Sequence, residues 1–245
     1  MKTMTNSRKH IIWLYSLIFC IGSTFNSAYA ETPMHLFWAD DMVQHVSQDK
    51  NAYAKGTSYM SWPNADGTGI YENFTKCSTF ITLVMMKSYG WTNSTFTNWM
   101  ASTSPSSDKY FDAINSENGF LKIDAIDEIM PGDIIAIKYP TGSTVTGHTM
   151  IVRSVATPRL AKTPIVPDTY QYEIQVIDSS QTGHGPTDTR LKPDGTFDSG
   201  AGIGVLRLYA NSSASVVGYT WSTYSTSIFY NISSRPIAVG RLIKL

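Results

Sequence analysis

The chain has 245 residues, and its 19 lysine and arginine residues are balanced by 19 aspartate and glutamate residues, giving a formal net charge of zero. No basic run or patch is visible, which argues against nucleic acid as a partner and against tight binding to an anionic surface. The length fits one domain that buries a sound core, with or without an N-terminal extension.

The first 30 residues have the pattern of an export signal. Lys2, Arg8 and Lys9 precede the apolar run 11–21, and a small-x-small cleavage site ends at Ala30. The apolar run is too short to span a bilayer as a helix of the mature protein. We therefore expect residues 1–30 to be a signal peptide and the mature chain to be secreted or periplasmic, in a bacterium, without a membrane anchor.

Removal of this leader changes the cysteine count and the charge. Cys20 leaves with it, so Cys77 is the only cysteine among the remaining 215 residues, which carry 16 basic and 19 acidic side chains. A single thiol in an exported protein is either bonded to another molecule or free and reactive. A lipoprotein with lipid on Cys20 is the alternative, which the bulky Phe19 before it disfavours.

Four Asn-x-Ser/Thr sites bear on the source of the protein, and one of them, Asn73, lies four residues before Cys77. A sugar there would crowd any active site at Cys77. Either the host does not glycosylate the chain, which suits a bacterium, or Cys77 is not an active site.

Helical patterns prevail in the first half of the mature chain. Residues 31–50 have apolar side chains near helical spacing, and residues 96–100 and 110–114 predict shorter helical pieces. Between them, residues 51–74 are rich in glycine, serine, asparagine and aromatic side chains, which predicts a loop that packs over another part of the fold.

The segment 75–90 predicts a helix buried on most sides, because few polar residues interrupt its apolar run. Thr75 is expected to cap this helix and Gly90 to end it. Cys77 then lies in the first turn, where free backbone N–H groups, the helix dipole and the neighbouring Lys76 all favour a thiolate. The alternative is an unreactive small residue that is merely buried.

Strand patterns follow from residue 131 onward. A segment with three prolines, 156–168, predicts an inserted arm. The order of helices first and strands afterwards predicts an α+β domain, with N-terminal helices packed against one side of a curved antiparallel sheet and a single domain over residues 31–245. The predicted strands cover residues 133–139, 148–155, 172–178, 203–209 and 236–242.

Thiol catalysis needs a base beside the sulfur and a third group that orients the base. His148 opens a predicted strand after Gly147, so its ring could face the start of the Cys77 helix. Asp178 ends the next long strand and could lie behind the imidazole. Taken singly, His148 would more often be an ordinary histidine at a strand end, and Asp178 an aspartate that begins a turn. Their order relative to Cys77 is what favours them together.

Other polar and aromatic residues are weaker candidates. His184, in a glycine-rich loop after Asp178, could line the cleft or be merely exposed. A zinc site formed by Cys77, His148, Asp178 and His184 is conceivable, but no close pair such as His-x-x-x-His is present, and we expect neither metal nor cofactor. Trp62 and other aromatic residues could stack on sugar rings, although most are expected in the core.

Three motifs at this spacing resemble the NlpC-type cysteine peptidases, which are papain-like cell-wall hydrolases. They are Cys-Ser at Cys77, which opens the buried helix, Pro-Gly-Asp at 131–133, and Gly-His at 147–148, each of which opens a strand. The resemblance covers about residues 59–180. The chain departs from the family pattern at Lys76 and Thr79, in the long arm after residue 156, and in the strands after residue 180.

The resemblance implies a papain-like fold in which Cys77 is the nucleophile, His148 the general base and Asp178 the third member of the triad. The backbone N–H of Cys77 would hold the oxyanion with a side chain from the upstream loop. Tyr59 resembles an upstream element of the family. We expect it to contact the substrate together with Trp62 and His184.

The substrate implied by the resemblance is the stem peptide of peptidoglycan, cut at an amide bond through an acyl-thioester. Related branches of the family act as amidases, acyltransferases or secreted toxins. We therefore keep open a secreted effector with the same chemistry and, from a different class, a non-catalytic cell-wall binding module on the same scaffold. We expect a monomer.

Overall fold

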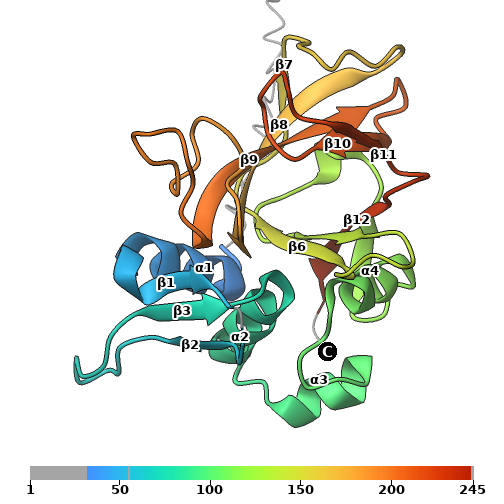
Figure 1. Ribbon diagram of the computed structural model, residues 1–245. Helices are drawn as coiled ribbons and strands as arrows, with labels where there is room; N and C mark the ends of the chain where they lie inside the picture. The colour runs from blue at the N-terminus through green and yellow to red at the C-terminus, as the bar shows by residue number, and fades with distance from the viewer. Residues whose placement is uncertain (1–31, 55, 244–245) are drawn as a thin grey trace, which may run out of the picture. The chain divides into compact units, whose positions relative to one another are not determined.

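The computed structural model describes residues 32–54 and 56–243 (Figure 1). The predicted signal peptide and Cys20 lie outside the described residues. The first half of the described chain is mainly helical, as expected from the sequence. Its helices are α1 (Met34–His45), α2 (Cys77–Tyr89), α3 (Asn93–Met100) and α4 (Ser107–Asn115), with short 3-10 turns at Gln48–Lys50 and Ile126–Glu128.

The second half forms one nine-stranded sheet in which all neighbouring strands are antiparallel. Its order is β11-β10-β9-β8-β6-β5-β12-β4, and β7 pairs with β8 outside this path. The predicted α+β class with an antiparallel sheet is confirmed. The strands are β4 (Phe120–Ile123), β5 (Ile134–Lys138), β6 (Gly147–Val152), β7 (Thr157–Arg159), β8 (Tyr170–Ser180), β9 (Gly200–Ala210), β10 (Val216–Thr220), β11 (Phe229–Asn231) and β12 (Ile237–Leu242).

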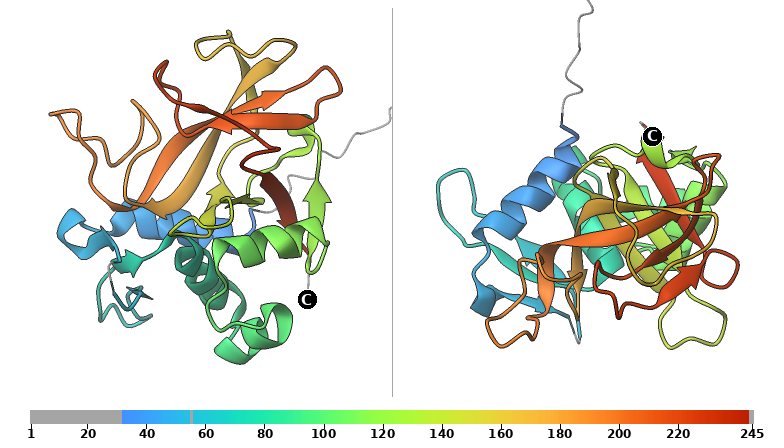
Figure 2. Two further views of the ribbon diagram at one scale, coloured as in Figure 1. Left: turned by 45° about the vertical axis from the view of Figure 1, so that its right-hand side comes forward. Right: turned by 90° about the horizontal axis from the view of Figure 1, so that it is seen from above.

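Both faces of the sheet are buried, which explains the nearly continuous apolar runs in strands such as β5. On one face, Ile134, Ile151 and Ile177 join a core with residues of α1, α2 and α4. On the other face, residues such as Ile135 and Met150 join a second core supplied mostly by the strands themselves. The helices lie along one side of the sheet (Figure 2). One face of the sheet therefore packs against the helices, and the other face encloses a core formed mostly by the strands.

The expected loop at 51–74 is instead a small sheet, and this prediction was wrong. It contains β1 (Asn51–Tyr53), β2 (Tyr59–Ser61) and β3 (Glu72–Thr75) in the order β1-β3-β2, with β1 and β3 parallel. Asn51 fixes this sheet to β9, because its side-chain amide donates to the carbonyl of Ala201 at 2.8 Å and accepts from the Ala201 N–H at 2.7 Å. The strands are three or four residues long, too short for a visible alternation.

Helix α2 begins at Cys77, so its N-cap lies one residue after the predicted cap, Thr75. Lys76 is the N-cap residue, and the hydroxyl of Thr75 donates instead to the side chain of Asn73 at 2.7 Å. The Thr75 carbonyl accepts from Ser179 of β8 at 2.9 Å, so Thr75 joins the helix entry to the sheet. Gly90 ends the helix as predicted, in the left-handed conformation at a φ of 67°.

None of the helices in the described part of the chain has the length and apolar character that crossing a membrane requires.

Candidate active site

The thiol of Cys77 lies at the first residue of α2, where the chain leaves β3 and enters the helix. The residue is 5% exposed, and Phe80, Ile81 and Val84 of the same helix are fully buried. The helix is thus held in the core by its apolar side chains, and its N-terminal end carries the sulfur to the edge of that core. The N-terminal placement predicted from the sequence is confirmed.

Polar groups surround the sulfur. The hydroxyl of Ser107, at the start of α4, lies 3.5 Å from Sγ, and the carbonyl oxygen of Gly147 lies 4.0 Å from it. Burial alone would raise the pKa of Cys77, but the charge of His148 and hydrogen bonds from His148, Ser107 and the Thr149 N–H lower it to about 6. The sulfur is therefore mainly a thiolate at neutral pH.

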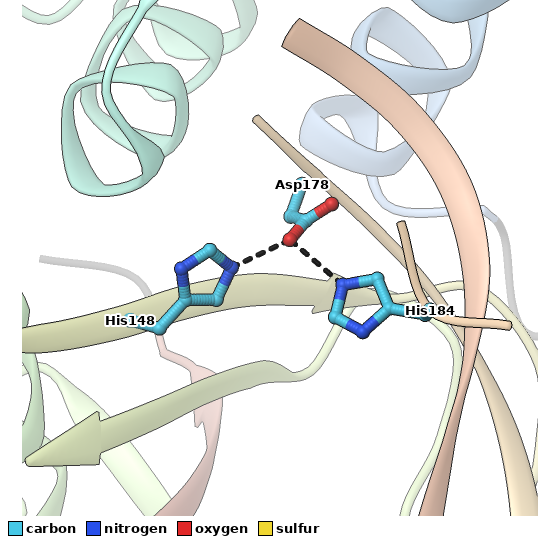
Figure 3. A group of neighbouring side chains, drawn as sticks. All are labelled: His148, Asp178 and His184. Carbon is cyan, nitrogen blue, oxygen red and sulfur yellow. Dashed lines mark hydrogen bonds and ion pairs between the residues drawn. The ribbon is translucent and has the colours of Figure 1, made fainter. Parts of the chain in front are cut away.

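His148, on β6, connects the sulfur to Asp178 on the neighbouring strand β8. Its Nε2 lies 2.5 Å from Oδ2 of Asp178 (Figure 3), so Nδ1 is the ring nitrogen that does not contact this carboxylate. Burial would lower the pKa of His148, but the thiolate charge of Cys77 and the hydrogen bond to Asp178 raise it to about 10. The structure therefore brings His148 and Asp178 into direct contact and places His148 near enough to Cys77 for each charge to shift the pKa of the other.

Asp178 is fully buried, yet it is held in its charged form. Burial opposes the charge, but Arg190, His184 and hydrogen bonds from both histidines bring the pKa of Asp178 well below its usual range. Nη1 of Arg190 lies 3.0 Å from Oδ1, an ion pair whose angle does not make a hydrogen bond. Arg190 also donates to Asp188, from Nε to Oδ1 at 2.9 Å and from Nη2 to Oδ2 at 2.8 Å. A buried carboxylate with such partners remains an acceptor for His148.

His184 is the second imidazole on the same carboxylate. Its Nε2 lies 2.9 Å from Oδ2 of Asp178, and its Nδ1 lies 2.8 Å from the carbonyl oxygen of Trp221 (Figure 3 shows the ring beside Asp178). Both partners are acceptors, so both hydrogen bonds form only when each ring nitrogen carries a proton. His184 is fully buried behind Asp178 and does not line the cleft, in contrast to the expectation that it would.

Trp221 packs against both imidazoles. Its ring centroid lies 4.7 Å from that of His148, edge to face, and 4.2 Å from that of His184. The indole N–H donates to the carbonyl of Gly183 at 3.1 Å, which fixes the ring. Trp221 also lines the cleft, so it separates the buried hydrogen bonds from water and strengthens them.

A cleft of about 580 Å³ opens beside the thiol. It contains Gly147, His148 and Lys76, the neighbour of Cys77 in the chain. Its lining also contains residues after position 218, namely Tyr219, Trp221, Tyr230 and Arg235. Cys77 itself is not among the lining residues, so the cleft reaches the site at His148 and at the residue that precedes the thiol.

Tyr53, on β1, is a residue that the sequence did not indicate. It lines the cleft, and its hydroxyl is close enough to Cys77 for the charge of the thiolate to shift its pKa. Burial and the charge on Cys77 raise the pKa of Tyr53, so the phenol keeps its proton and remains a donor. The only sequence signal for this position was its aromatic type within a segment expected to be a loop.

The remaining predicted contact residues lie elsewhere. Tyr59 is 46% exposed and stacks on Phe74, with ring centroids 5.1 Å apart. Trp62 packs edge to face on Trp38, and neither Tyr59 nor Trp62 is among the residues that line the cleft. Asn73, the glycosylation motif nearest the thiol, is fully buried and donates to Asn51 at 2.8 Å, so a sugar there is incompatible with the folded chain.

The residues considered for a zinc site form a hydrogen-bonded network instead. Atoms of His148, Asp178 and His184 that could bind a metal lie within 4.8 Å of one another, without Cys77 among them. Both imidazoles already contact the same carboxylate oxygen, and Arg190 faces the other oxygen. A second cation there would be repelled by the guanidinium, so the residues fit an ion-pair network better than a metal centre.

No protein-family model matches the chain, and no solved structure matches it. A comparison with curated proteins finds a relative in Acanthamoeba polyphaga mimivirus, the uncharacterized protein R653, which is 32% identical over 222 residues. The match covers 86% of this chain and 96% of the relative. With this identity and coverage, the chain belongs to the same family as the mimivirus protein R653.

Proposed function

We propose that the protein is an exported cysteine hydrolase that cleaves an amide bond, with Cys77 as nucleophile, His148 as general base and acid, and Asp178 as the group that orients His148. The observation that carries the proposal is the position of the thiol at the start of α2, near an imidazole whose Nε2 lies 2.5 Å from a buried carboxylate. The lowered pKa of Cys77 supports it. An unreactive structural cysteine needs no such partners.

The reaction follows from these positions. The thiolate of Cys77 attacks the carbonyl carbon of the amide, and negative charge develops on the carbonyl oxygen. In this proposal the backbone N–H of Cys77 and the neutral hydroxyl of Tyr53 donate to that oxygen, and the raised pKa of Tyr53 supports its role as a donor. His148 gives its proton to the departing amine, which leaves an acyl-thioester on Cys77. His148 then takes a proton from water while the water oxygen attacks the acyl carbon. The C–S bond breaks, which releases the acid and restores the thiolate of Cys77 beside protonated His148.

The substrate we favour is the stem peptide of peptidoglycan, on the strength of the resemblance to NlpC-type peptidases and their papain-like fold. The order of the described elements, with the thiol on a helix and the base on an antiparallel sheet, agrees with that fold. A secreted effector that attacks another amide with the same chemistry is the second candidate. The family relationship to a protein of an amoeba-infecting virus favours keeping it.

The experiment that tests the proposal has two readouts. The full chain is treated with iodoacetamide and mapped by mass spectrometry, and separately incubated with purified peptidoglycan whose released fragments are analysed in the same way. We expect Cys77 to be alkylated within minutes at pH 7 and the wild type to release peptide fragments. The variant Cys77→Ala should release none.

The matched control is Ser88→Ala, at the far end of the same helix, whose hydroxyl donates only to the carbonyl of Val84. It should behave as the wild type. Hydrolysis retained in Cys77→Ala would end the proposal. An alkylated but inactive wild type would direct the search to other amide substrates, which a library of acyl-peptide amides would sample.

A further inference from the structure

The lining of the cleft contains an arginine, Arg235, whose charge has no carboxylate partner among the described residues. The guanidinium of Arg235 lies between two tyrosine rings, 4.5 Å from the centroid of Tyr139 and 4.0 Å from that of Tyr230. These two cation–π contacts hold the guanidinium in place. Its N–H groups make no side-chain hydrogen bond or ion pair among the described residues, so they remain available to a ligand.

The hydroxyl of Tyr219 lies beside this arginine. Tyr219 is 1% exposed and lines the same cleft, and in the described part of the chain its hydroxyl finds no partner in hydrogen-bonding geometry. Arg235 is close enough to influence it without a well-formed hydrogen bond. A buried hydroxyl without a partner costs stability, so its presence needs an explanation.

The charge of the cleft points to the kind of ligand. Among the described residues, its lining contains two cations, Lys76 and Arg235, and no aspartate or glutamate, while the charge of His148 is balanced by Cys77 and Asp178. The chain as a whole carries equal numbers of acidic and basic residues. The cleft is therefore a positive region that would attract an anion from solution.

We propose that Arg235 and the Tyr219 hydroxyl form a carboxylate-binding subsite, and that the preferred substrate carries a carboxylate close to the amide bond that Cys77 attacks. A carboxylate is planar and accepts at two oxygens. Arg235 can donate to it in the plane of the guanidinium, and Tyr219 can donate its unused proton. The second half of the proposal rests on the proposed function, whereas the subsite itself can be tested without catalysis.

The test measures binding to the full-length Cys77→Ala chain by titration calorimetry with three matched ligands. N-acetylglutamine carries only a terminal carboxylate, N-acetylglutamate α-amide carries only a side-chain carboxylate, and N-acetylglutamine amide carries none. We expect at least one of the two anions to bind about tenfold more tightly than the neutral amide, since a charge-assisted hydrogen bond contributes at least that factor. The anion that binds better identifies the source of the carboxylate.

Two substitutions locate the subsite. Arg235→Gln should remove the preference for anions, and Tyr219→Phe should weaken it about tenfold or less. Because the hydroxyl has no partner in the free protein, Tyr219→Phe should leave the melting temperature unchanged or raise it. The control is Lys122→Gln on β4, a change of charge at a residue that does not line the cleft.

The proposal is overturned if the anions bind no better than the neutral amide or do not bind, or if the preference survives Arg235→Gln. It is also overturned if Lys76→Gln removes the preference and Arg235→Gln does not. These results are independent of hydrolysis. A chain that binds anions but does not react at Cys77 would refute the proposed function alone, and a hydrolase without the preference would refute the subsite alone.

Discussion

The acidity of Cys77 is decided by competition between burial and a small number of polar contacts. Burial raises the pKa of a thiol, whereas the charge of His148 and donors from His148, Ser107 and Thr149 lower it. The lowering prevails because these groups act at short range in a site from which most water is excluded. The thiolate and the imidazolium coexist between about pH 6 and about pH 10.

The pH dependence of alkylation should report this competition. A thiol whose pKa is lowered reacts above that pKa and loses reactivity as the pH falls through it. We expect iodoacetamide to alkylate Cys77 at half its maximal rate near pH 6 in the wild type. In His148→Gln the burial remains and the attracting charge is gone, so the midpoint should move to the ordinary thiol value of 9.0 or above. Rates at Cys77 are measured by peptide mapping, and equal midpoints in the two proteins would contradict the ion pair.

Tyr53 separates catalysis from thiol reactivity. Tyr53→Phe removes a donor for the oxyanion and should lower kcat by roughly 10²-fold, the usual effect of losing one such donor. Alkylation by iodoacetamide forms no oxyanion, so its rate should change far less. The matched control is Tyr59→Phe, on an exposed ring outside the cleft, which should leave kcat unchanged. Loss of activity in Tyr59→Phe and not in Tyr53→Phe would instead support the assignment of Tyr59 made from the sequence.

At the scale of elements, the pairing of β8 and β9 makes room for the buried charges. Gly202 lies opposite Asp178 in the register of these strands, and Gly204 lies opposite Val176. A Cβ at Gly202 would lie 2.5 Å from Nε of Arg190. The glycines of β9 are therefore needed so that an arginine and a histidine can approach the strand closely.

A larger residue in place of a glycine of β9 should displace the residues that contact Asp178. A Cβ at Gly204 would lie 2.6 Å from the Cβ of His184 and would also clash with Asp188. We expect Gly204→Ala to destabilise the fold by about 1–3 kcal/mol, as overpacking does, and to reduce alkylation of Cys77 near pH 7. Denaturant unfolding measures the first effect. Gly56→Ala, where a Cβ meets nothing within 4 Å, is the control and should be close to neutral.

At the scale of the molecule, the candidate site lies where three parts of the chain meet. Helix α2 supplies the sulfur, the large sheet supplies His148 and Asp178, and the small sheet supplies Tyr53. The segment between β8 and β9 returns Asp188 and Arg190 to the core, where they are 5% and 3% exposed. The buried charges of Asp178, Asp188 and Arg190 therefore lie on or beside strands β8 and β9, whose apolar residues belong to the cores on both faces of the large sheet.

The whole fold should depend on the charge of Asp178. Because its pKa is well below 3.8 in the folded chain, Asp178 contributes stability that is fully present at neutral pH and is lost as the pH falls below about 4. Asp178→Asn leaves Arg190 without one of its partners, and at pH 7 it should cost about 3–5 kcal/mol. Its stability should also fall less steeply than that of the wild type below pH 4. Unfolding by urea at several pH values measures both effects, with the exposed Asp124→Asn as control.

Local sequence patterns were enough to predict the α+β class of the fold, and they singled out Cys77, His148 and Asp178 as candidates. Apolar periodicity located α2, β5, β6, β8, β9 and β12, because those segments are long enough for their local pattern to persist. The position of Cys77 at a helix start also follows from local rules, since Gly90 and the apolar run fix where the helix lies.

Only the tertiary structure decided which distant residues complete the site. Strands β1, β10 and β11 have three to five residues each, and their pairing depends on partners far along the chain rather than on their own pattern. Tyr53, Arg190 and Arg235 reach the cleft or the carboxylate through those pairings and through the buried ion pairs. A local sequence pattern indicates the type of an element and where it begins and ends. Which residues contact one another across the fold depends instead on the order of the strands and on how the buried charges pair.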